Sequence, residues 1–293
     1  MIRELKTFVC VAREGTFAAA GERVGLTQAA VSAQMKRLEE ALGVSLFERQ
    51  GRSARLTALG RQTLERAQEL IRLYEGLASS SLNPTATTLV VIGAIASVQR
   101  AWLPRVMARF HRRFPGCRSR VVPGLSMDLI NQVDAGEMDM AVVIRPPFSL
   151  PSDLNWTLLA REPFRLVVPA SEQGGDWREL LSTQPFVRYD RASFGGRRVD
   201  RFLRDMHFGV KEVCEVDELD AILQLVANHV GVALVPETAS LRRWPASVRA
   251  IDLGEHTFHR DIGLVHRATG QLSEPVHALV QAISALSRAR ERA

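Results

Sequence analysis

The spacing of apolar residues near the N-terminus predicts three consecutive helices. Within residues 3–14, 17–24 and 28–42, apolar side chains recur three and four positions apart, which is the repeat of one buried helix face. A glycine follows each segment, and glycine readily adopts the backbone conformation that ends a helix. Threonines precede the second and third segments, where a hydroxyl can cap the helix. Two short helices joined by a tight turn predict a helix-turn-helix.

The third predicted helix has one apolar face and one face of small and polar residues. Val31, Met35 and Leu38 point to the same side, whereas Ala29 and Ala33 lie opposite. In a helix-turn-helix, the second helix enters the major groove of DNA and contacts base edges. Small side chains would let its backbone approach the bases. A helix in an ordinary bundle could show the same two faces, so this segment alone leaves both interpretations open.

The segment after the third helix favours DNA binding. Residues 45–49 and 54–57 have the pattern of two strands around a tight turn, with arginines at the tip and flanks of this hairpin. A two-stranded wing with arginine at its tip is typical of contact with phosphates or the minor groove. The residues predicted to contact DNA are Thr27, Gln28, Ala29, Ser32, Ala33, Lys36, Arg37, Arg49, Arg52 and Arg55.

A long amphipathic helix is predicted over residues 58–79. Its apolar residues alternate three and four positions apart, as in the seam of a coiled coil. We predict a dimerisation helix, because the DNA sites of helix-turn-helix proteins are commonly two-fold symmetric. The alternative is a helix that packs only on its own domain. The predicted seam consists of Leu64, Ala67, Ile71, Tyr74 and Ala78.

From residue 89 onward, strands alternate with helices. Strands at 89–95, 118–123 and 139–144 are separated by helices at 103–114 and 126–135. This alternation predicts right-handed βαβ units and a parallel sheet. A second set of strands and helices follows and ends in a C-terminal helix, so two α/β halves would enclose a cleft. The expected crossings between the halves are residues 145–161 and 253–260.

The polar, proline-containing run at 79–85 predicts a boundary between the helical and the α/β parts. The fold class is therefore α/β with an N-terminal winged helix-turn-helix. The predicted boundaries are 1–58 for the winged domain, 59–87 for the linker helix and hinge, and 88–293 for the α/β region, with one subdomain at about 88–161 and 266–293 and the other at about 162–265.

The charge of the chain is compatible with a polyanionic partner but does not identify one. The 293 residues carry a net charge of +6. Lysine occurs at only three positions, so a general compositional bias explains the arginine content. No apolar stretch is long enough to span a bilayer, and the N-terminal residues do not resemble a secretory signal. We therefore expect a cytoplasmic protein without a membrane partner.

The α/β region lacks the motifs of common enzymes. It contains no GxSxG elbow, P-loop, GxGxxG or HExxH. The histidines lack metal-ligand spacing, and the nearest pair, His256 and His259, has no third ligand in its context. We expect neither an enzyme nor a bound metal or other cofactor. Cys10, Cys117 and Cys214 are widely spaced without a CxxC, which indicates reduced thiols.

Several motifs with fixed spacing resemble one family of bacterial regulators. In the N-terminal part they are Phe8-x-x-Val11-Ala12-x-x-Gly15-Thr16-Phe17-x-Ala19-Ala20, Leu26-Thr27-Gln28-x-Ala30-Val31-Ser32-x-Gln34, Leu38-Glu39, Leu42-Gly43-x-x-Leu46-Phe47-x-Arg49 and Leu56-Thr57-x-x-Gly60. In the α/β part they are Gly93-x-x-x-Ser97, Gly136-x-x-Asp139 and Gly231-Val232-Ala233-Leu234-Val235-Pro236. The whole chain resembles the LysR-type transcriptional regulators. Ala29 departs from the proline common at that position, which loosens the first helical turn slightly and removes no contact group.

The resemblance implies an architecture and a set of partners. Behind the winged domain it implies two Rossmann-like subdomains of the periplasmic-binding-protein type II fold, with a small-molecule coinducer between them. It implies binding to double-stranded promoter or operator DNA, a homotetramer built as a dimer of dimers, and RNA polymerase as a further partner.

Candidate effector-binding residues lie in loops that follow the strands, where open α/β sheets bind ligands. These loops contain Ser97 and Val98, Ser126 and Met127, and Arg145. The resemblance adds Ser193, Phe194 and Leu219 from the second half. Capping of a helix is an alternative role for the serines, and a surface ion pair is one for Arg145. If Arg145 faces the cleft, it would favour an anionic coinducer.

Three functions other than a coinducer-controlled regulator are compatible with parts of the sequence. A thiol-based redox regulator on the same scaffold could use Cys117 and Cys214, although their positions near strands favour buried, inert thiols. An enzyme is disfavoured by the missing motifs. A bare solute-binding protein is disfavoured by the winged N-terminus and the lack of a signal sequence.

Overall fold

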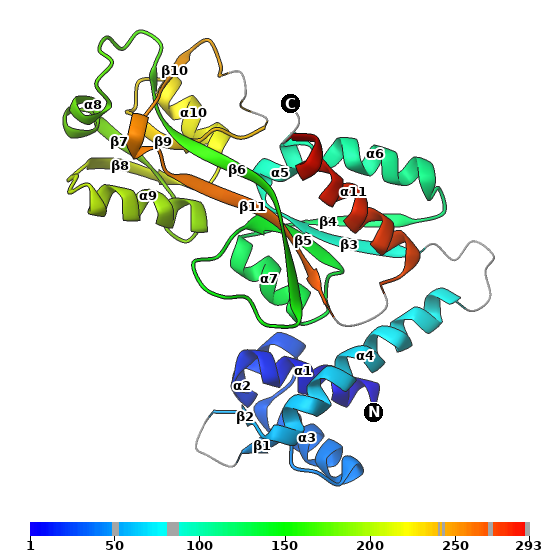
Figure 1. Cartoon of the computed structure of the whole chain (residues 1–293). Helices are drawn as coiled ribbons and strands as arrows, with labels where there is room; N and C mark the ends of the chain where they lie inside the picture. Colours follow the sequence, from blue (N-terminus) through cyan, green and yellow to red (C-terminus); the bar gives the residue numbers. More distant parts are fainter. Residues whose placement is uncertain (49–52, 81–87, 240, 242–243, 269–271, 291–293) are drawn as a thin grey trace. The chain divides into compact units, whose positions relative to one another are not determined.

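The computed structural model describes residues 1–48, 53–80, 88–239, 241, 244–268 and 272–290. The chain divides into two compact units, Met1–Thr87 and Thr88–Ala293, which are described separately (Figure 1). Among the described residues, no helix has the length and apolar character needed to cross a membrane.

The first unit consists of four helices and a short hairpin. Its elements are α1 (Ile2–Glu14), α2 (Phe17–Val24), α3 (Gln28–Leu42), β1 (Phe47–Glu48), β2 (Arg55–Leu56) and α4 (Ala58–Ser80). Gly25, which separates α2 from α3, has a φ of 70°, and this left-handed conformation costs glycine little. The side-chain oxygens of Thr16 and Thr27 accept hydrogen bonds from the first turns of α2 and α3. The sequence predicted these helices, their caps and their ends.

A single hydrophobic core holds the first unit together. Phe8 and Val11 of α1 are fully buried, as is Val31 of α3. The ring of Phe47, on β1, packs edge-on against the rings of Phe8 and Phe17 at 5.6 and 5.3 Å. The hairpin is therefore anchored in the core at its base.

The second unit contains two α/β subdomains and two long strands that run through both. The elements of the first subdomain are β3 (Leu89–Ala94), α5 (Ala96–Ala101), α6 (Leu103–Arg113), β4 (Arg118–Pro123), α7 (Ser126–Asp134), β5 (Met140–Ile144) and the C-terminal α11 (Glu274–Arg290). Those of the second are α8 (Trp177–Thr183), β7 (Pro185–Tyr189), α9 (Phe194–Asp205), β8 (Lys211–Val216), α10 (Leu219–Ala227), β9 (Ala233–Pro236), β10 (Val248–Ile251) and the short 3-10 helix η1 (Gly254–His256). The long strands are β6 (Leu154–Pro169) and β11 (His259–Arg267).

The sheet is mixed, which corrects the prediction of a parallel sheet. Strand β3 pairs in parallel with β4 and β5, as the βαβ pattern predicts. Strands β6 and β11 are antiparallel to each other, and β11 is antiparallel to β5. In the second subdomain, β6 pairs antiparallel with β9 and β10, and β7 pairs in parallel with β8.

The crossings between the subdomains are strands rather than loops (Figure 1). Residues 154–161, predicted as part of a connection, form the first half of β6 and pair with β11. The sequence did not predict a strand here because this half of β6 mixes polar and apolar residues, and its pairing partner lies about 100 residues away in the sequence. The helices α5 and α8 and the strand β10 were also missed, since each is short.

Each subdomain has its own hydrophobic cluster. One cluster contains Val90, Val142 and Leu279, and the other contains Phe164, Phe186 and Leu234. Strands β6 and β11 are the continuous elements that connect the two clusters, so residues at the middle of these strands lie between the subdomains.

Candidate functional site

The exposed face of α3 carries the residues predicted to contact DNA. Thr27 caps the helix by accepting a hydrogen bond from the Ala30 amide at 3.2 Å. Val31, Met35 and Leu38 are buried on the opposite face. The exposed predicted residues are Thr27, Gln28, Ala29, Ser32, Ala33, Lys36 and Arg37. The helix therefore presents a continuous surface of small, polar and basic side chains.

The wing is held against α3 by its backbone. The Glu39 carboxylate of α3 accepts hydrogen bonds from the amides of Leu46 and Phe47, at 2.6 and 3.2 Å. Arg55, on β2, is exposed. Arg49 and Arg52, predicted at the wing, lie outside the described residues. The fixed base of the hairpin places Arg55 on the same unit as the exposed face of α3.

Part of the predicted seam of α4 packs on its own domain. Ala67 is 1% exposed in the core of the first unit, and Leu64 and Ile71 are half-buried against that core. Tyr74 is exposed, and the side chain of Ala78 lies outside the described part of the chain. The same spacing suits any apolar surface, so the sequence could not tell whether the seam meets its own domain or a partner. Other apolar side chains of α4, those of Leu59, Leu70 and Leu73, are exposed.

A cavity of about 230 Å³ lies between the two subdomains of the second unit. One wall comes from α5, the loop before α7 and the end of β5, and the other from the loops that precede α9 and α10. Hydroxyl groups line both walls, since Ser97 and Ser126 lie on one side and Tyr189, Ser193 and Thr238 on the other. A cavity with apolar side chains and hydroxyl groups on both walls suits a small ligand with a few hydrogen-bonding groups.

The serines of the first wall do not cap helices, contrary to the alternative considered for them. The Oγ of Ser126, a buried residue, accepts a hydrogen bond from the Ile144 amide at the end of β5, at 3.1 Å. Ser97 accepts a hydrogen bond from Arg260 at 3.0 Å. Ser193 does cap α9, because its Oγ accepts from the Gly196 amide at 2.9 Å. Each serine thus ties the cavity wall to a neighbouring element.

A buried arginine connects the two subdomains at this cavity. Arg260 of β11 is fully buried and pairs with Glu162 of β6, with two nitrogen–oxygen distances of 2.8 Å. Its remaining donors reach Ser97 in the first subdomain and the Tyr189 hydroxyl in the second, the latter at 3.3 Å. Burial raises the pKa of Tyr189, so its hydroxyl stays protonated at neutral pH. One guanidinium therefore connects both crossing strands and both cavity walls.

Carboxylates are more numerous than free cations around the cavity. Arg100, the arginine that lines it, pairs with Glu218 at 3.1 Å and with Asp220. Asp217 also lines the cavity, and burial together with the charges of Asp190 and Glu218 raises the pKa of its carboxyl. The ionisable side chains around the cavity therefore carry a net charge of zero or below before a ligand binds.

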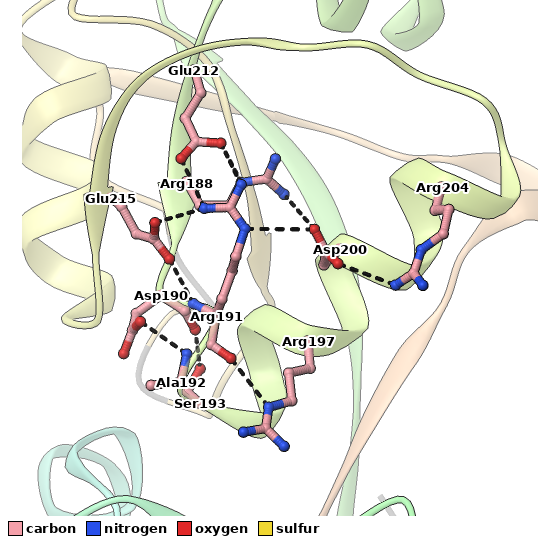
Figure 2. A network of polar contacts seen from close by, with 10 residues as sticks. All are labelled: Arg188, Asp190, Arg191, Ala192, Ser193, Arg197, Asp200, Arg204, Glu212 and Glu215. Atoms are coloured by element: carbon pink, nitrogen blue, oxygen red, sulfur yellow. Dashed lines mark hydrogen bonds and ion pairs between the residues drawn. The ribbon is translucent and has the colours of Figure 1, made fainter.

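The loop before α9 is positioned by a network of ion pairs (Figure 2). The guanidinium of Arg191 lies 2.6 Å from a carboxylate oxygen of Glu212 and 2.6 Å from one of Glu215, both on β8. Arg188, a buried residue of β7, donates to Glu212 at 3.0 Å and lies 3.6 Å from Asp200 of α9. These contacts fix the loop that brings Ser193 to the cavity.

The structure separates the predicted effector residues into two groups. Ser97, Ser126, Ser193 and Leu219 line the cavity. The other four do not belong to its lining and are Val98, Met127, Arg145 and Phe194. Val98 and Phe194 are buried in a hydrophobic cluster, and Met127 is exposed. Arg145 is exposed, with its guanidinium over the Trp156 ring at 5.9 Å from the ring centroid.

Comparison with known families accounts for nearly the whole chain. Residues 2–61 match the family described as "Bacterial regulatory helix-turn-helix protein, lysR family", and residues 85–287 match the "LysR substrate binding domain". The chain belongs to the LysR family of transcriptional regulators.

Relatives of this LysR-family chain support the same conclusion. It is 32% identical over 260 residues to the HTH-type transcriptional regulator IlvR of Caulobacter vibrioides, covering 86% of this chain and 87% of the relative. It is 28% identical over 259 residues to the HTH-type transcriptional regulator IlvY of Escherichia coli, covering 85% of each. The relatives are named as transcriptional regulators, and the chain is a DNA-binding regulator rather than an enzyme.

Solved structures show the same fold. A full-length OxyR from Pseudomonas aeruginosa matches with a TM-score of 0.61 and 22% identity over 98% of this chain and 94% of its own. Full-length CbnR in complex with its target DNA matches with a TM-score of 0.54 and 21% identity over 98% of this chain and 99% of its own. These matches confirm the winged helix-turn-helix and the two α/β subdomains of the LysR architecture.

The thiols of this LysR-family chain do not favour redox control. All three cysteines are free. Cys117 and Cys214 pack against different hydrophobic clusters, and burial raises the pKa of the Cys117 thiol, which lowers its reactive thiolate fraction. Among the described residues, no group of histidine, cysteine or acidic side chains could hold a metal ion.

Sequence reasoning missed the polar residues that matter most to the cavity. These are Arg260, Glu162, Tyr189, Thr238, Asp217 and Arg100. Arg260 and Glu162 could have been recognised in the sequence, because each is a charged residue next to an apolar strand segment. A charge inside a buried strand needs a partner.

Proposed function

We propose that this LysR-family regulator binds operator DNA through α3 and the wing and is controlled by a small polar coinducer in the cavity between its subdomains. The observation that carries the proposal is the pair of hydroxyl-lined cavity walls, one from each subdomain, joined by Arg260. A ligand that contacts both walls would favour one relative position of the subdomains, and so shift the population of the active form. We further propose a cytoplasmic homotetramer, a dimer of dimers, that contacts RNA polymerase.

The DNA-contacting residues divide into two roles. Gln28 and Ser32 lie exposed on the first turns of α3, and we propose that they contact base edges. We propose that Arg55, on the wing, contacts a phosphate. Base contacts discriminate between sequences, whereas phosphate contacts strengthen binding to all of them.

Replacing Gln28 and Arg55 separately tests this division. We expect Gln28→Ala to reduce the preference for operator over random DNA by about 1–3 kcal/mol. We expect Arg55→Ala to weaken binding to both DNAs alike and to lower the slope of log affinity against log salt by about one unit. Fluorescence anisotropy titrations at four salt concentrations measure both quantities. A loss of discrimination in Arg55→Ala with an unchanged salt slope would contradict the assignment.

The charges of the cavity suggest the chemistry of the coinducer. The hypothesis of an anionic ligand depended on Arg145, which does not line this cavity. Arg100 is already paired, whereas Asp217 has no ion pair among the described residues. We propose an uncharged or amine-bearing polar molecule that hydrogen-bonds to the hydroxyls and to Asp217.

A thermal-shift screen of metabolites on the full chain tests this proposal. A coinducer at one hundred times its Kd is expected to stabilise the native chain by about 2.7 kcal/mol. Asp217→Asn should weaken the binding of that ligand by about tenfold or more, because a hydrogen bond to a charged group is lost. The matched control is Asp128→Asn, which changes an exposed carboxylate outside the cavity. Equal affinity in the wild type and Asp217→Asn would refute the role of Asp217.

The exposed leucines of α4 suggest a dimer face. They adjoin a groove lined by Leu5, Leu42, Val44, Leu59, Gln62, Thr63, Arg66, Ala67 and Leu70. Apolar side chains exposed along one long helix are typical of a surface that is buried against a partner. We propose that α4 of a second copy covers Leu70 and Leu73, in place of the seam predicted from the sequence.

A further inference from the structure

A second cavity lies in the same unit, beside the crossing strands, and is distinct from the hydroxyl-lined one. It has a volume of about 390 Å³ and is lined by α9, the loop around η1, the start of β11 and Arg161 of β6. Its lining residues and those of the first cavity have no member in common. Three guanidinium groups, those of Arg161, Arg198 and Arg201, belong to its wall, and we name it the arginine cavity.

Two of the three arginines of this cavity, Arg198 and Arg201, form no ion pair among the described residues. Among the described residues, no carboxylate lies within 4.0 Å of Arg198 or Arg201. Arg161 reaches Asp261 only at 4.0 Å. Arg198 is half-buried, and this burial lowers the pKa of its guanidinium. The negative charge of Asp261 raises that pKa, whereas the positive charges of Arg201, Arg145 and Arg161 lower it. Asp205 and Asp261 also line the cavity, so its three arginines exceed its two carboxylates by one charge.

Part of the remaining wall suits an apolar body. Phe202 of α9 stacks on Phe258 with a distance of 4.5 Å between ring centroids, and both residues line the cavity together with Met206. Burial and the charge of Arg161 lower the pKa of His259, so this imidazole is neutral at pH 7 and adds a hydrogen-bonding group without adding charge.

We propose that the arginine cavity binds an organic carboxylate with an apolar body, as a ligand site separate from the coinducer cavity. The carboxylate would lie between Arg198 and Arg201, where a planar guanidinium can bind it through two hydrogen bonds. The apolar body would pack on Phe202 and Phe258. The N-terminal cap of the same helix, Ser193, lines the first cavity, so both ligands would contact α9.

Calorimetric titration of the full chain with phenylacetate tests this proposal. The wild type and Arg105→Met, which removes an exposed arginine outside the cavity, should bind phenylacetate saturably. Arg198→Met/Arg201→Met should bind it about tenfold more weakly or worse, because charge-assisted hydrogen bonds are lost. Arg201→Met alone should show a smaller loss of phenylacetate affinity. Because Arg201 is exposed, this single variant should fold normally and so tests the site even if the double variant misfolds. Phenylacetamide, which has no charge, should bind much more weakly than phenylacetate.

Several results would overturn the proposal. They are the absence of saturable phenylacetate binding to the wild type, an unchanged affinity in Arg198→Met/Arg201→Met, or equal binding of phenylacetamide. Inorganic phosphate that binds as tightly as phenylacetate would overturn the requirement for an apolar body. Loss of phenylacetate binding in Asp217→Asn would place the ligand in the first cavity instead. These titrations measure neither operator binding nor the coinducer response. A negative result would therefore reject the arginine cavity as a ligand site without rejecting the proposed function.

Discussion

Replacing Arg260 by methionine is expected to lower the free energy of unfolding of the second unit by about 3–5 kcal/mol. Arg260 is fully buried, and its removal leaves the carboxylate of Glu162 buried without its partner. An uncompensated buried charge is strongly destabilising, because the protein interior solvates it poorly. Urea unfolding of the full chain, followed by tryptophan fluorescence, measures the change.

The double variant Arg260→Met/Glu162→Gln distinguishes two effects of losing Arg260. One is the unpaired buried charge on Glu162, and the other is the loss of the further hydrogen bonds that Arg260 donates. Because both charges are removed, we expect the double variant to recover a large part of the lost stability. Even then, the hydrogen bonds from Arg260 to Ser97 and Tyr189 are gone, so the coinducer response should remain impaired. A single variant as stable as the wild type would show that the buried pair contributes little. A stable double variant with a normal response would refute the coupling role of Arg260.

Replacing Leu70 and Leu73 by glutamate is expected to halve the molar mass of the assembly at micromolar concentration. The two leucines are 51% and 58% exposed in the isolated chain, and burying each in a dimer would contribute about 1.5–3 kcal/mol. Glutamates at these positions would place like charges in the dimer face. Analytical ultracentrifugation measures the mass, and operator titrations should show a parallel loss of affinity, because one copy contacts only one half-site.

The matched control is Leu158→Glu, which changes a leucine of similar exposure, 47%, on β6. Its molar mass should equal that of the wild type. Circular dichroism should show that Leu70→Glu/Leu73→Glu keeps its helix content, since neither side chain belongs to the core of the first unit. An unchanged mass would mean that α4 is not the dimer face.

The N-terminal domain could be predicted from local patterns in considerable detail. The apolar stripes of the first three helices and the glycines that end them are features of neighbouring residues, and they suffice to define the elements. The threonine caps are equally local, because each hydroxyl bonds within three residues. The faces of α3 follow from the same repeat, so the exposed surface was predictable residue by residue.

The seam of α4 marks the limit of such patterns. Leu64, Ala67 and Ile71 are predicted to meet a partner, yet Ala67 is buried in its own domain and the other two pack partly against that core. Periodicity states which side of a helix is apolar but not which surface covers it. The exposed leucines, which we propose as the dimer face, could be recognised only after the intramolecular contacts were known.

The cavity in the second unit was predicted in part. The loops that follow strands were expected to meet, because in an α/β sheet the carboxyl ends of parallel strands lie along one edge, and Ser97 and Ser126 were located in this way. Val98 and Met127 do not line this cavity, because consecutive residues on the first turns of α5 and α7 point in different directions. Arg145 does not line this cavity either, because a position at the end of a strand does not determine where a long side chain turns.

The sequence by itself determined the winged helix-turn-helix, the α/β alternation and the membership of a regulator family, because these rest on local repeats and on motifs with fixed spacing. Only the tertiary structure decided that the crossings are antiparallel strands, that Arg260 and Glu162 pair between them, and that three arginines line a second cavity. The physical reason is that Arg260 and Glu162 lie 98 positions apart in the chain. Contacts of this kind depend on the complete sheet and leave no periodic trace in the sequence.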